Sequence, residues 1–217
     1  MTSAAAGRRA AVGVAESANT AIVVTVSEAG DCLDRRTVRL TDGLPTHPYH
    51  HEGAWAMGRY LQTPGARSMS MDQVVALVGR VEAAAGQGAV AALDEVAAAV
   101  AVPIVAVALR ACPALPPTIE ARIRAPRAQT MADSVMYRQA MARAAGARGW
   151  HVSWYDRDDI RPGAGTASGR PARSRAAGHG DEPSLIAAMG RAMGPPWQAA
   201  HKLAAAAALA ALRTTRA

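Results

Sequence analysis

The stretch AAVGVAES, Ala10 to Ser17, decides the fold. Its apolar run is typical of a buried strand, and it carries an acid, Glu16, next to its end. The connection that follows, ESAN, holds neither a helix nor the glycine-rich phosphate loop of a dinucleotide-binding domain. The chain is therefore expected to return at once as an antiparallel strand. Glu16 is then either a metal ligand at a strand tip or a solvated strand end.

The rest of the chain alternates between strand and helix patterns around two irregular segments, 43–70 and 157–182. The second segment is rich in Arg, Gly and Pro and is expected to be a mobile surface loop. The first expected strand starts at Val12. The other four are Thr20–Gly30, 35–43, Val102–Leu109 and Trp150–Asp156. The expected helices are a short one beginning at Pro48, then Ser70–Ala85, Ala89–Val100, Thr130–Ala147, Pro183–Met193 and Trp197–Arg213.

Composition is that of one globular domain. The 217 residues are enough for one sizeable core, half of them are apolar, and mean hydropathy is +0.02. The apolar residues are mostly Ala and Val, with no Phe, so stability must come from many close contacts. Cys32 and Cys112 show no metal or disulfide spacing, and we expect a cytoplasmic protein without a membrane anchor.

The formal charge of +7 comes from 24 Lys and Arg against 17 Asp and Glu. Arginine supplies most of the positive charge, and its planar guanidinium suits phosphate, so an anionic partner is one interpretation. The other is a general compositional bias toward Ala, Arg, Gly and Pro. Both interpretations stay open at this point.

The order of three strands followed by helix, strand, helix, strand and helix resembles the ribonuclease H-like fold, in its Holliday-junction-resolvase branch. The resemblance covers about residues 10–211 and implies one α/β domain with a five-stranded mixed sheet in the order 3-2-1-4-5 and helices on both faces. It also implies acids that hold two Mg²⁺ or Mn²⁺ ions for phosphodiester hydrolysis. The partner would then be DNA or RNA.

The resemblance assigns candidate catalytic residues to this chain. Glu16 takes the first-strand position, where Asp is usual in the family, and Glu120 is the nearest carboxylate after the fourth strand, which ends on Arg110. Asp133 follows on the next helix, and His201 stands where the last helix usually has an acid. Glu16 and Glu120 are the candidate metal ligands, with too few carboxylates for two metals.

The segment HPYHHEG is an alternative metal site. It supplies four side chains of ligand type, His47, His50, His51 and Glu52, which would suit zinc or manganese but lack the specific H-E-x-x-H spacing. The alternative is a polar loop whose histidines bind a partner, a phosphate or nothing.

Basic and aromatic segments are candidates for nucleic-acid contacts. Arg110 and the three arginines of RIRAPR, namely Arg122, Arg124 and Arg127, are expected to contact phosphates, and GRPARSR at Gly169–Arg175 is either a second clamp or a solvated loop. Trp150, Trp154 and Tyr155 are either base-stacking side chains or strand residues of the core.

Two functions follow from these observations. The first is a resolvase-like nuclease that uses a divalent metal near Glu16. The second is a non-catalytic nucleic-acid- or protein-binding module that keeps the same fold. Fewer than three acids within metal reach of Glu16 would favour the module. A homodimer or a protein partner is compatible with both, and the sequence does not distinguish DNA from RNA or identify the substrate structure or pathway.

Overall fold

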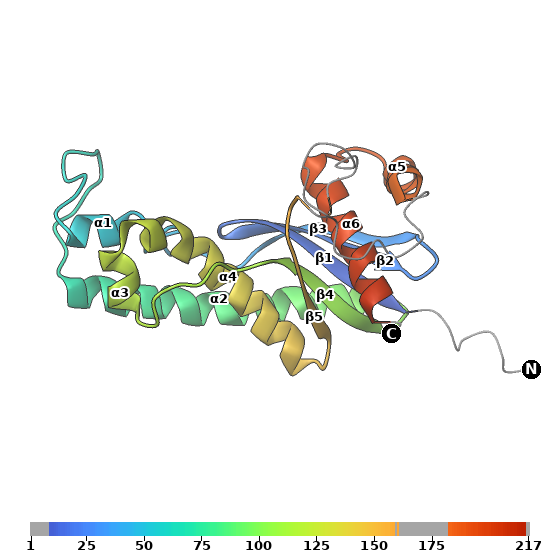
Figure 1. Cartoon of the computed structure of the whole chain (residues 1–217), viewed down its shortest axis with the longest axis horizontal. Coiled ribbons are helices and arrows are strands. Elements are labelled where there is room, and N and C mark those ends of the chain that lie inside the picture. The colour runs from blue at the N-terminus through green and yellow to red at the C-terminus, as the bar shows by residue number, and fades with distance from the viewer. Residues whose placement is uncertain (1–8, 159, 161–181, 216–217) are drawn as a thin grey trace, which may run out of the picture.

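The computed structural model describes residues 9–158, 160 and 182–215. Their elements, shown in Figure 1, follow the order β1 (Ala10–Ser17), β2 (Thr20–Ser27), β3 (Cys32–Arg39), α1 (Glu52–Ala56), α2 (Met71–Ala99), β4 (Ile104–Arg110), α3 (Ile119–Arg124), α4 (Pro126–Ala147), β5 (His151–Tyr155), α5 (Glu182–Met193) and α6 (Ala199–Thr214). The expected loop 157–182 lies mostly outside these residues, as does the basic stretch Gly169–Arg175.

The five strands form one mixed sheet in the order β3-β2-β1-β4-β5, the order that the resemblance implies. β1 and β2 pair antiparallel, from Ala10 opposite Ser27 to Ser17 opposite Thr20, and β3 pairs antiparallel with β2. β4 runs parallel to β1, and β5 runs parallel to β4. The carboxyl ends of β1, β4 and β5 therefore share one edge of the sheet.

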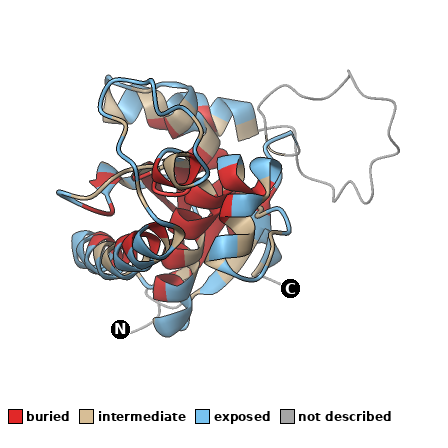
Figure 2. Ribbon diagram, turned by 90° about the vertical axis from the view of Figure 1, so that its left-hand side faces the viewer, coloured by how far each residue is buried: buried red, intermediate tan, exposed pale blue. Residues whose placement is uncertain are grey.

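Side chains of β1 alternate between two hydrophobic cores, one on each face of the sheet. Val12 and Val14 belong to the core shared with α2 and α4, whereas Ala11 and Ala15 belong to the core shared with α5 and α6. Figure 2 shows the buried residues gathered at the centre of the molecule. This period of two is what a strand covered on both faces requires, and it decides which way Glu16 points.

Alanine and glycine let α6 approach the sheet closely. A Cβ on Gly13 would lie 1.8 Å from the carbonyl oxygen of Ala204, so only glycine fits there. Ala204 to Ala208 are all fully buried. The expectation that this chain is held together by many close contacts agrees with this packing.

One continuous helix replaces two that the sequence suggested. The expected separate helices, Ser70–Ala85 and Ala89–Val100, are wrong, because α2 runs unbroken through Gly86 and Gly88. A Cβ at Gly88 would lie 2.0 Å from the carbonyl oxygen of Leu40, so this glycine allows a close approach of α2 to the chain after β3 and does not end the helix. At the start of α2, Ser70 and Gln73, which have the spacing of a capping box, form one.

Other helix starts also differ from expectation. The short helix begins at Glu52 and not at Pro48, because residues 48–51 form turns ahead of it. α4 begins at Pro126 and not at Thr130, since proline suits the first helical position, and α3 precedes it in what was expected to be loop. Cys32 is the first residue of β3 and not part of a turn.

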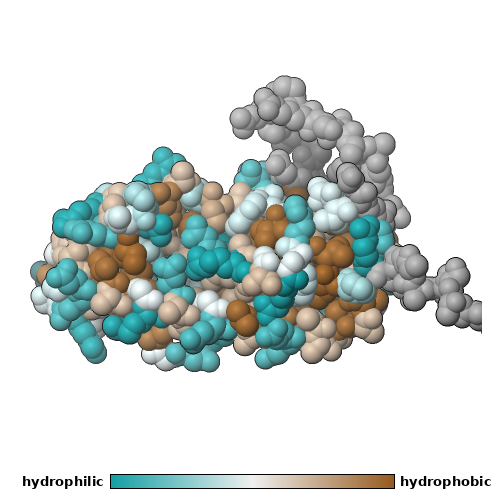
Figure 3. Space-filling view, turned by 90° about the horizontal axis from the view of Figure 1, so that it is seen from below, coloured by the Kyte–Doolittle hydropathy of each residue, from teal (hydrophilic) through white to brown (hydrophobic). Residues whose placement is uncertain are grey.

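Helix α2 is long and apolar enough to cross a membrane by length and composition alone, and it is the one described helix that meets this test. Its residues Val74, Leu77, Val78 and Val81 are buried in the core shared with the sheet. On the face seen in Figure 3, hydrophobic side chains form separate patches among hydrophilic ones. The helix thus contributes one face to the core of an α/β domain.

Candidate functional site

Glu16 projects from β1 toward α4 and ends in a buried ion pair. It follows Val12 and Val14 on the same face, and its Oε1 lies 2.5 Å from Nε of Arg138. Both side chains are nearly inaccessible, with 8% and 6% of their surface exposed. Glu16 is therefore not a solvated strand end, and its carboxylate already has a cationic partner.

Arg138 also ties this carboxylate to the neighbouring strand. Its Nη1 donates a 3.0 Å hydrogen bond to the carbonyl oxygen of Ala111, the residue after β4. The hydroxyl of Tyr155, at the end of β5, donates to the carbonyl oxygen of Val14. The ends of all three parallel strands are thus linked by side chains, so this edge of the sheet is held rigidly.

His201 lies on the opposite face of the sheet from the Glu16 carboxylate. It is a buried residue of α6, whose close contact with Gly13 marks the other side of β1. Its Nδ1 accepts a 3.1 Å hydrogen bond from the backbone N–H of Gln198, and its ring stacks on Trp197. Burial lowers the pKa of His201 below its ordinary value. In this position the imidazole caps a helix.

Glu120 lies on α3, beyond the end of the sheet. It is half-exposed and pairs with Arg124 one turn further along the same helix, at 2.6 Å. The structure thus does not bring Glu16, Glu120 and His201 together.

Asp133 is buried and organises the histidine segment. Its Oδ1 and Oδ2 accept hydrogen bonds from the backbone N–H groups of Tyr49 and His50, at 2.9 and 3.0 Å. Burial raises the pKa of Asp133 to about 7. The two hydrogen bonds favour the carboxylate and oppose this rise, but the effect of burial is larger. Nδ1 of His47 lies 3.9 Å from Oδ2. The sequence singled out both Asp133 and this segment but did not connect them.

The imidazole rings of His47, His50 and His51 lie next to one another in this segment. The rings of His47 and His51 are 5.3 Å apart, and those of His50 and His51 are 5.2 Å apart. Burial, followed by the neighbouring imidazoles, lowers the pKa of His47 and of His50. At neutral pH, the neutral form of these two side chains is therefore more populated than that of a free histidine.

Among residues 9–158, 160 and 182–215, no three His, Cys, Asp or Glu side chains form a group that could hold a metal ion. Around Glu16 the structure supplies one carboxylate bound to a guanidinium, a poorer donor set than the several oxygens that Mg²⁺ or Mn²⁺ takes. The metal sites expected at Glu16 and Glu120 and at the histidine segment stay predictions.

Four buried polar atoms near α1 have no hydrogen-bond partner within the described structure. They are His50 Nδ1, Glu52 Oε2, Arg59 Nε and Gln129 Nε2. Arg59 Nη2 donates to Gln129 Oε1 at 2.8 Å, so two of these side chains are joined through their other atoms. Buried polar groups without partners are rare in proteins, so four of them close together distinguish this region from the rest of the described structure.

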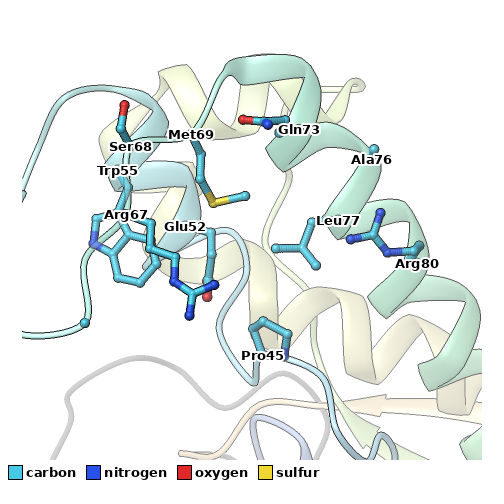
Figure 4. A pocket seen from close by; sticks show the side chains of 11 residues that line it. Pro45, Glu52, Trp55, Arg67, Ser68, Met69, Gln73, Ala76, Leu77 and Arg80 are labelled. Atoms are coloured by element: carbon cyan, nitrogen blue, oxygen red, sulfur yellow. The ribbon is translucent and has the colours of Figure 1, made fainter.

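A pocket of about 760 Å³ opens beside this cluster. Figure 4 shows Glu52 and Trp55 of α1, Met69 before α2, and Leu77 and Arg80 of α2 around it. The other lining residues are Pro45, Gly65, Arg67, Ser68, Gln73 and Ala76. Among them, sequence analysis singled out only Glu52 as a candidate ligand, because the pocket is made by segments brought together in the tertiary structure.

The four predicted phosphate-binding arginines differ in whether their guanidinium groups already have partners within the described structure. Within the described structure, Arg110 and Arg127 are exposed and make no side-chain hydrogen bond or ion pair. Arg122 is bound to the carbonyl of Pro116 and the hydroxyl of Tyr49, and Arg124 is bound to Glu120. Arg110 and Arg127 are therefore the freer candidates of the four.

The three aromatic side chains predicted to stack on bases differ in their exposure. Tyr155 is buried in the core, and Trp150 is partly buried with Arg148 over its ring at 5.9 Å. Trp154 is 46% exposed on the edge strand. Trp154 is thus the most accessible of the three.

Compared with known protein families, curated proteins and solved structures, the chain matches none of them. What defines the class of protein is therefore the observed fold itself, an α/β domain with a five-stranded mixed sheet in the order 3-2-1-4-5.

Proposed function

We propose that this chain is a nucleic-acid-binding module that keeps a ribonuclease H-like fold without its hydrolytic centre. The strand order and pairing directions support the fold assignment. The observation that carries the non-catalytic proposal is the pairing of Glu16 with Arg138. A carboxylate buried against a guanidinium is neutralised, and a metal would have to displace that partner.

The proposed binding surface is the end of the molecule that extends from the carboxyl edge of the sheet. Figure 1 shows α1, α3 and the first turns of α2 and α4 gathered there. Arg110 and Arg127 are its free predicted cations. Of its acids, Glu52 and Asp133 are buried and Glu120 is paired with Arg124, whereas Asp72 in the first turn of α2 is exposed. Guanidinium groups without acidic partners at a surface attract phosphates, and the carboxyl edge is where open α/β sheets bind ligands.

The test measures binding and cleavage in one titration. Labelled single-stranded, duplex and branched DNA and RNA are titrated with protein, with Mg²⁺ or Mn²⁺ and with EDTA. We expect binding without cleavage, unchanged by EDTA and weakened by about tenfold when salt is raised from about 50 to 200 mM. Arg127→Ala should weaken it, and Arg191→Ala, at an exposed arginine on α5, is the matched control.

Metal-dependent cleavage that is lost in Glu16→Gln, with the melting temperature preserved, would replace this proposal by the resolvase-like nuclease. Binding to none of the nucleic acids would refute both. We also propose a cytoplasmic location, as expected from the sequence.

A further inference from the structure

The pocket beside α1 has the size of a small-molecule site. Its volume of about 760 Å³ falls in the range of pockets that hold nucleotide-sized ligands. It is bounded by α1, the segment before α2, and the first three turns of α2 (Figure 4). The Ser70 capping box fixes where α2 begins, so the walls on that side are positioned by regular structure.

One part of the lining is apolar and includes an aromatic ring. Pro45, Trp55, Met69 and Leu77 supply it, and Figure 4 shows Met69 and Leu77 directed toward the middle of the pocket. Trp55 is only partly buried, so its indole is accessible to a ligand. A flat aromatic ring would fit between the apolar side chains and Trp55, because an indole stacks on the planar ring of any nucleobase.

Glu52 gives the pocket a carboxylate with one oxygen, Oε2, that has no hydrogen-bond partner within the described structure. The residue is only 9% exposed, it lines the pocket, and its buried Oε2 accepts no hydrogen bond within the described structure. Burial raises the pKa of this carboxyl above its ordinary value. Because this oxygen has almost no accessible surface, a ligand that offers N–H donors would satisfy it once the Glu52 side chain turns toward the pocket, and a base edge carries such donors.

Two arginines complete the lining. Arg67 and Arg80 are exposed, and neither forms an ion pair or side-chain hydrogen bond in the part of the chain that the structure describes. With Glu52 ionised the three charged lining side chains sum to +1, and with Glu52 protonated they sum to +2. The lining therefore favours a ligand that combines a planar ring bearing N–H groups with an anionic group.

We propose that this pocket binds a single nucleotide, with its base against Trp55 and hydrogen-bonded to Glu52, and with its phosphate between Arg67 and Arg80. The inference rests on the proposed nucleic-acid-binding function and adds the unit that is recognised. The nucleotide is either free or the terminal or unstacked residue of a strand, since both present the same chemistry.

The experiment measures the affinity of the full chain for nucleoside monophosphates by equilibrium dialysis. GMP is the main probe, because its base edge presents two adjacent N–H donors; AMP, UMP and guanosine are the comparison ligands. We expect saturable binding of GMP, a loss of about tenfold or more in Arg80→Ala, and a similar loss for guanosine, which lacks the phosphate. Arg143→Ala, at an exposed arginine of α4 outside the pocket, is the matched control.

Glu52→Gln tests the base contact separately. Because the amide replaces one acceptor oxygen with a donor, this variant should reduce the preference for GMP over UMP by about fivefold or more while keeping the phosphate contact. Thermal melting of each variant shows whether it is folded, and Trp55→Phe gives a second folded probe that keeps an aromatic surface.

Outcomes separate this inference from the proposed function. If oligonucleotides bind but GMP does not bind at about 10 mM, and Arg80→Ala leaves oligonucleotide affinity unchanged, the pocket inference is wrong and the binding module stands. If GMP binds but no oligonucleotide does, the source is free nucleotide, and the nucleic-acid function fails. If neither binds, both fail. Competition between GMP and a strand for one site supports the strand as the source.

Discussion

Arg138 of α4 holds the carboxylate of Glu16 in β1 across 122 positions of sequence, with 2.5 Å between Nε and Oε1. The pair is buried on the α4 face of the sheet and bridges to the end of β4 through Ala111. The carboxylate that the sequence offered as either a metal ligand or a solvated strand end is thus paired with a buried guanidinium.

The first prediction concerns this pair. Arg138→Met leaves a buried carboxylate without a partner, so we expect the free energy of unfolding to fall by about 3–5 kcal/mol. Arg143→Met is the matched control on the same helix, since its exposed pair with Glu82 should be worth about 1 kcal/mol or less. Urea unfolding at pH 7 measures both. Equal losses in the two variants would contradict a structural role for the buried pair.

A double-mutant cycle sharpens that prediction. Glu16→Met combined with Arg138→Met removes both charges, so the double variant should lose less stability than the sum of the two single variants. Strict additivity would mean that the two side chains do not interact in solution.

The second prediction concerns Asp133 and pH. Its folded-state pKa of about 7 lies above its ordinary 3.8, so the folded chain holds this proton over a range where the unfolded chain has released it. The stability that this group contributes is therefore full below pH 3.8 and is lost as pH rises through about 7. We expect the difference in unfolding free energy between wild type and Asp133→Asn to shrink over that window.

The Asp133→Asn comparison cancels the titration of His47, His50 and Glu52, which are present in both proteins, to the extent that their pKa values are unchanged. Hydrogen exchange supplies an independent measurement. The variant turns an N–H donor toward one of two backbone N–H groups, so the amides of Tyr49 and His50 should exchange faster. A pH-independent difference with unchanged exchange would argue that Asp133 is not the group that holds this segment.

The third prediction separates two glycines of α2. Gly88→Ala places a Cβ 2.0 Å from the carbonyl oxygen of Leu40, so the helix must move and stability should fall by about 1–3 kcal/mol. A Cβ at Gly86 meets nothing within 4 Å, so Gly86→Ala should raise stability by up to about 1 kcal/mol through helix propensity. Thermal or urea unfolding distinguishes the two, and a neutral Gly88→Ala would show that the approach to Leu40 is not required.

The fourth prediction tests whether His201 acts as a cap. His201→Ala removes the acceptor for the Gln198 N–H and the stacking on Trp197, at a cost of about 1 kcal/mol. His201→Gln keeps an acceptor at the third helical position and should recover much of that loss. Lys202→Ala, an exposed neighbour, serves as the control in the same unfolding measurement. If His201→Gln is as damaging as alanine, the capping role is wrong.

Local pattern was enough to predict the five strands and most of the helices, but not α3 or the continuity of α2. The apolar run of Ala10–Ser17 and the short turn after it define a hairpin start, and alternation marks the remaining strands. The strand order 3-2-1-4-5 came from the resemblance and is confirmed. Local pattern led to a wrong helix end near Gly86 and Gly88. Glycine can end a helix, but it also permits close packing, and at Gly88 the contact with Leu40 shows that it does the latter.

By itself, the sequence determined where the five strands and most of the helices lie, because these patterns depend on spacings of two to four residues. The partners of the charged groups were decided by the tertiary structure alone. Glu16 meets Arg138 and Asp133 meets the backbone of Tyr49 and His50 through the packing of α4, and Glu52 lines a pocket because α1 lies beside the start of α2. Contacts between distant segments depend on the whole fold, and no short-range pattern encodes them.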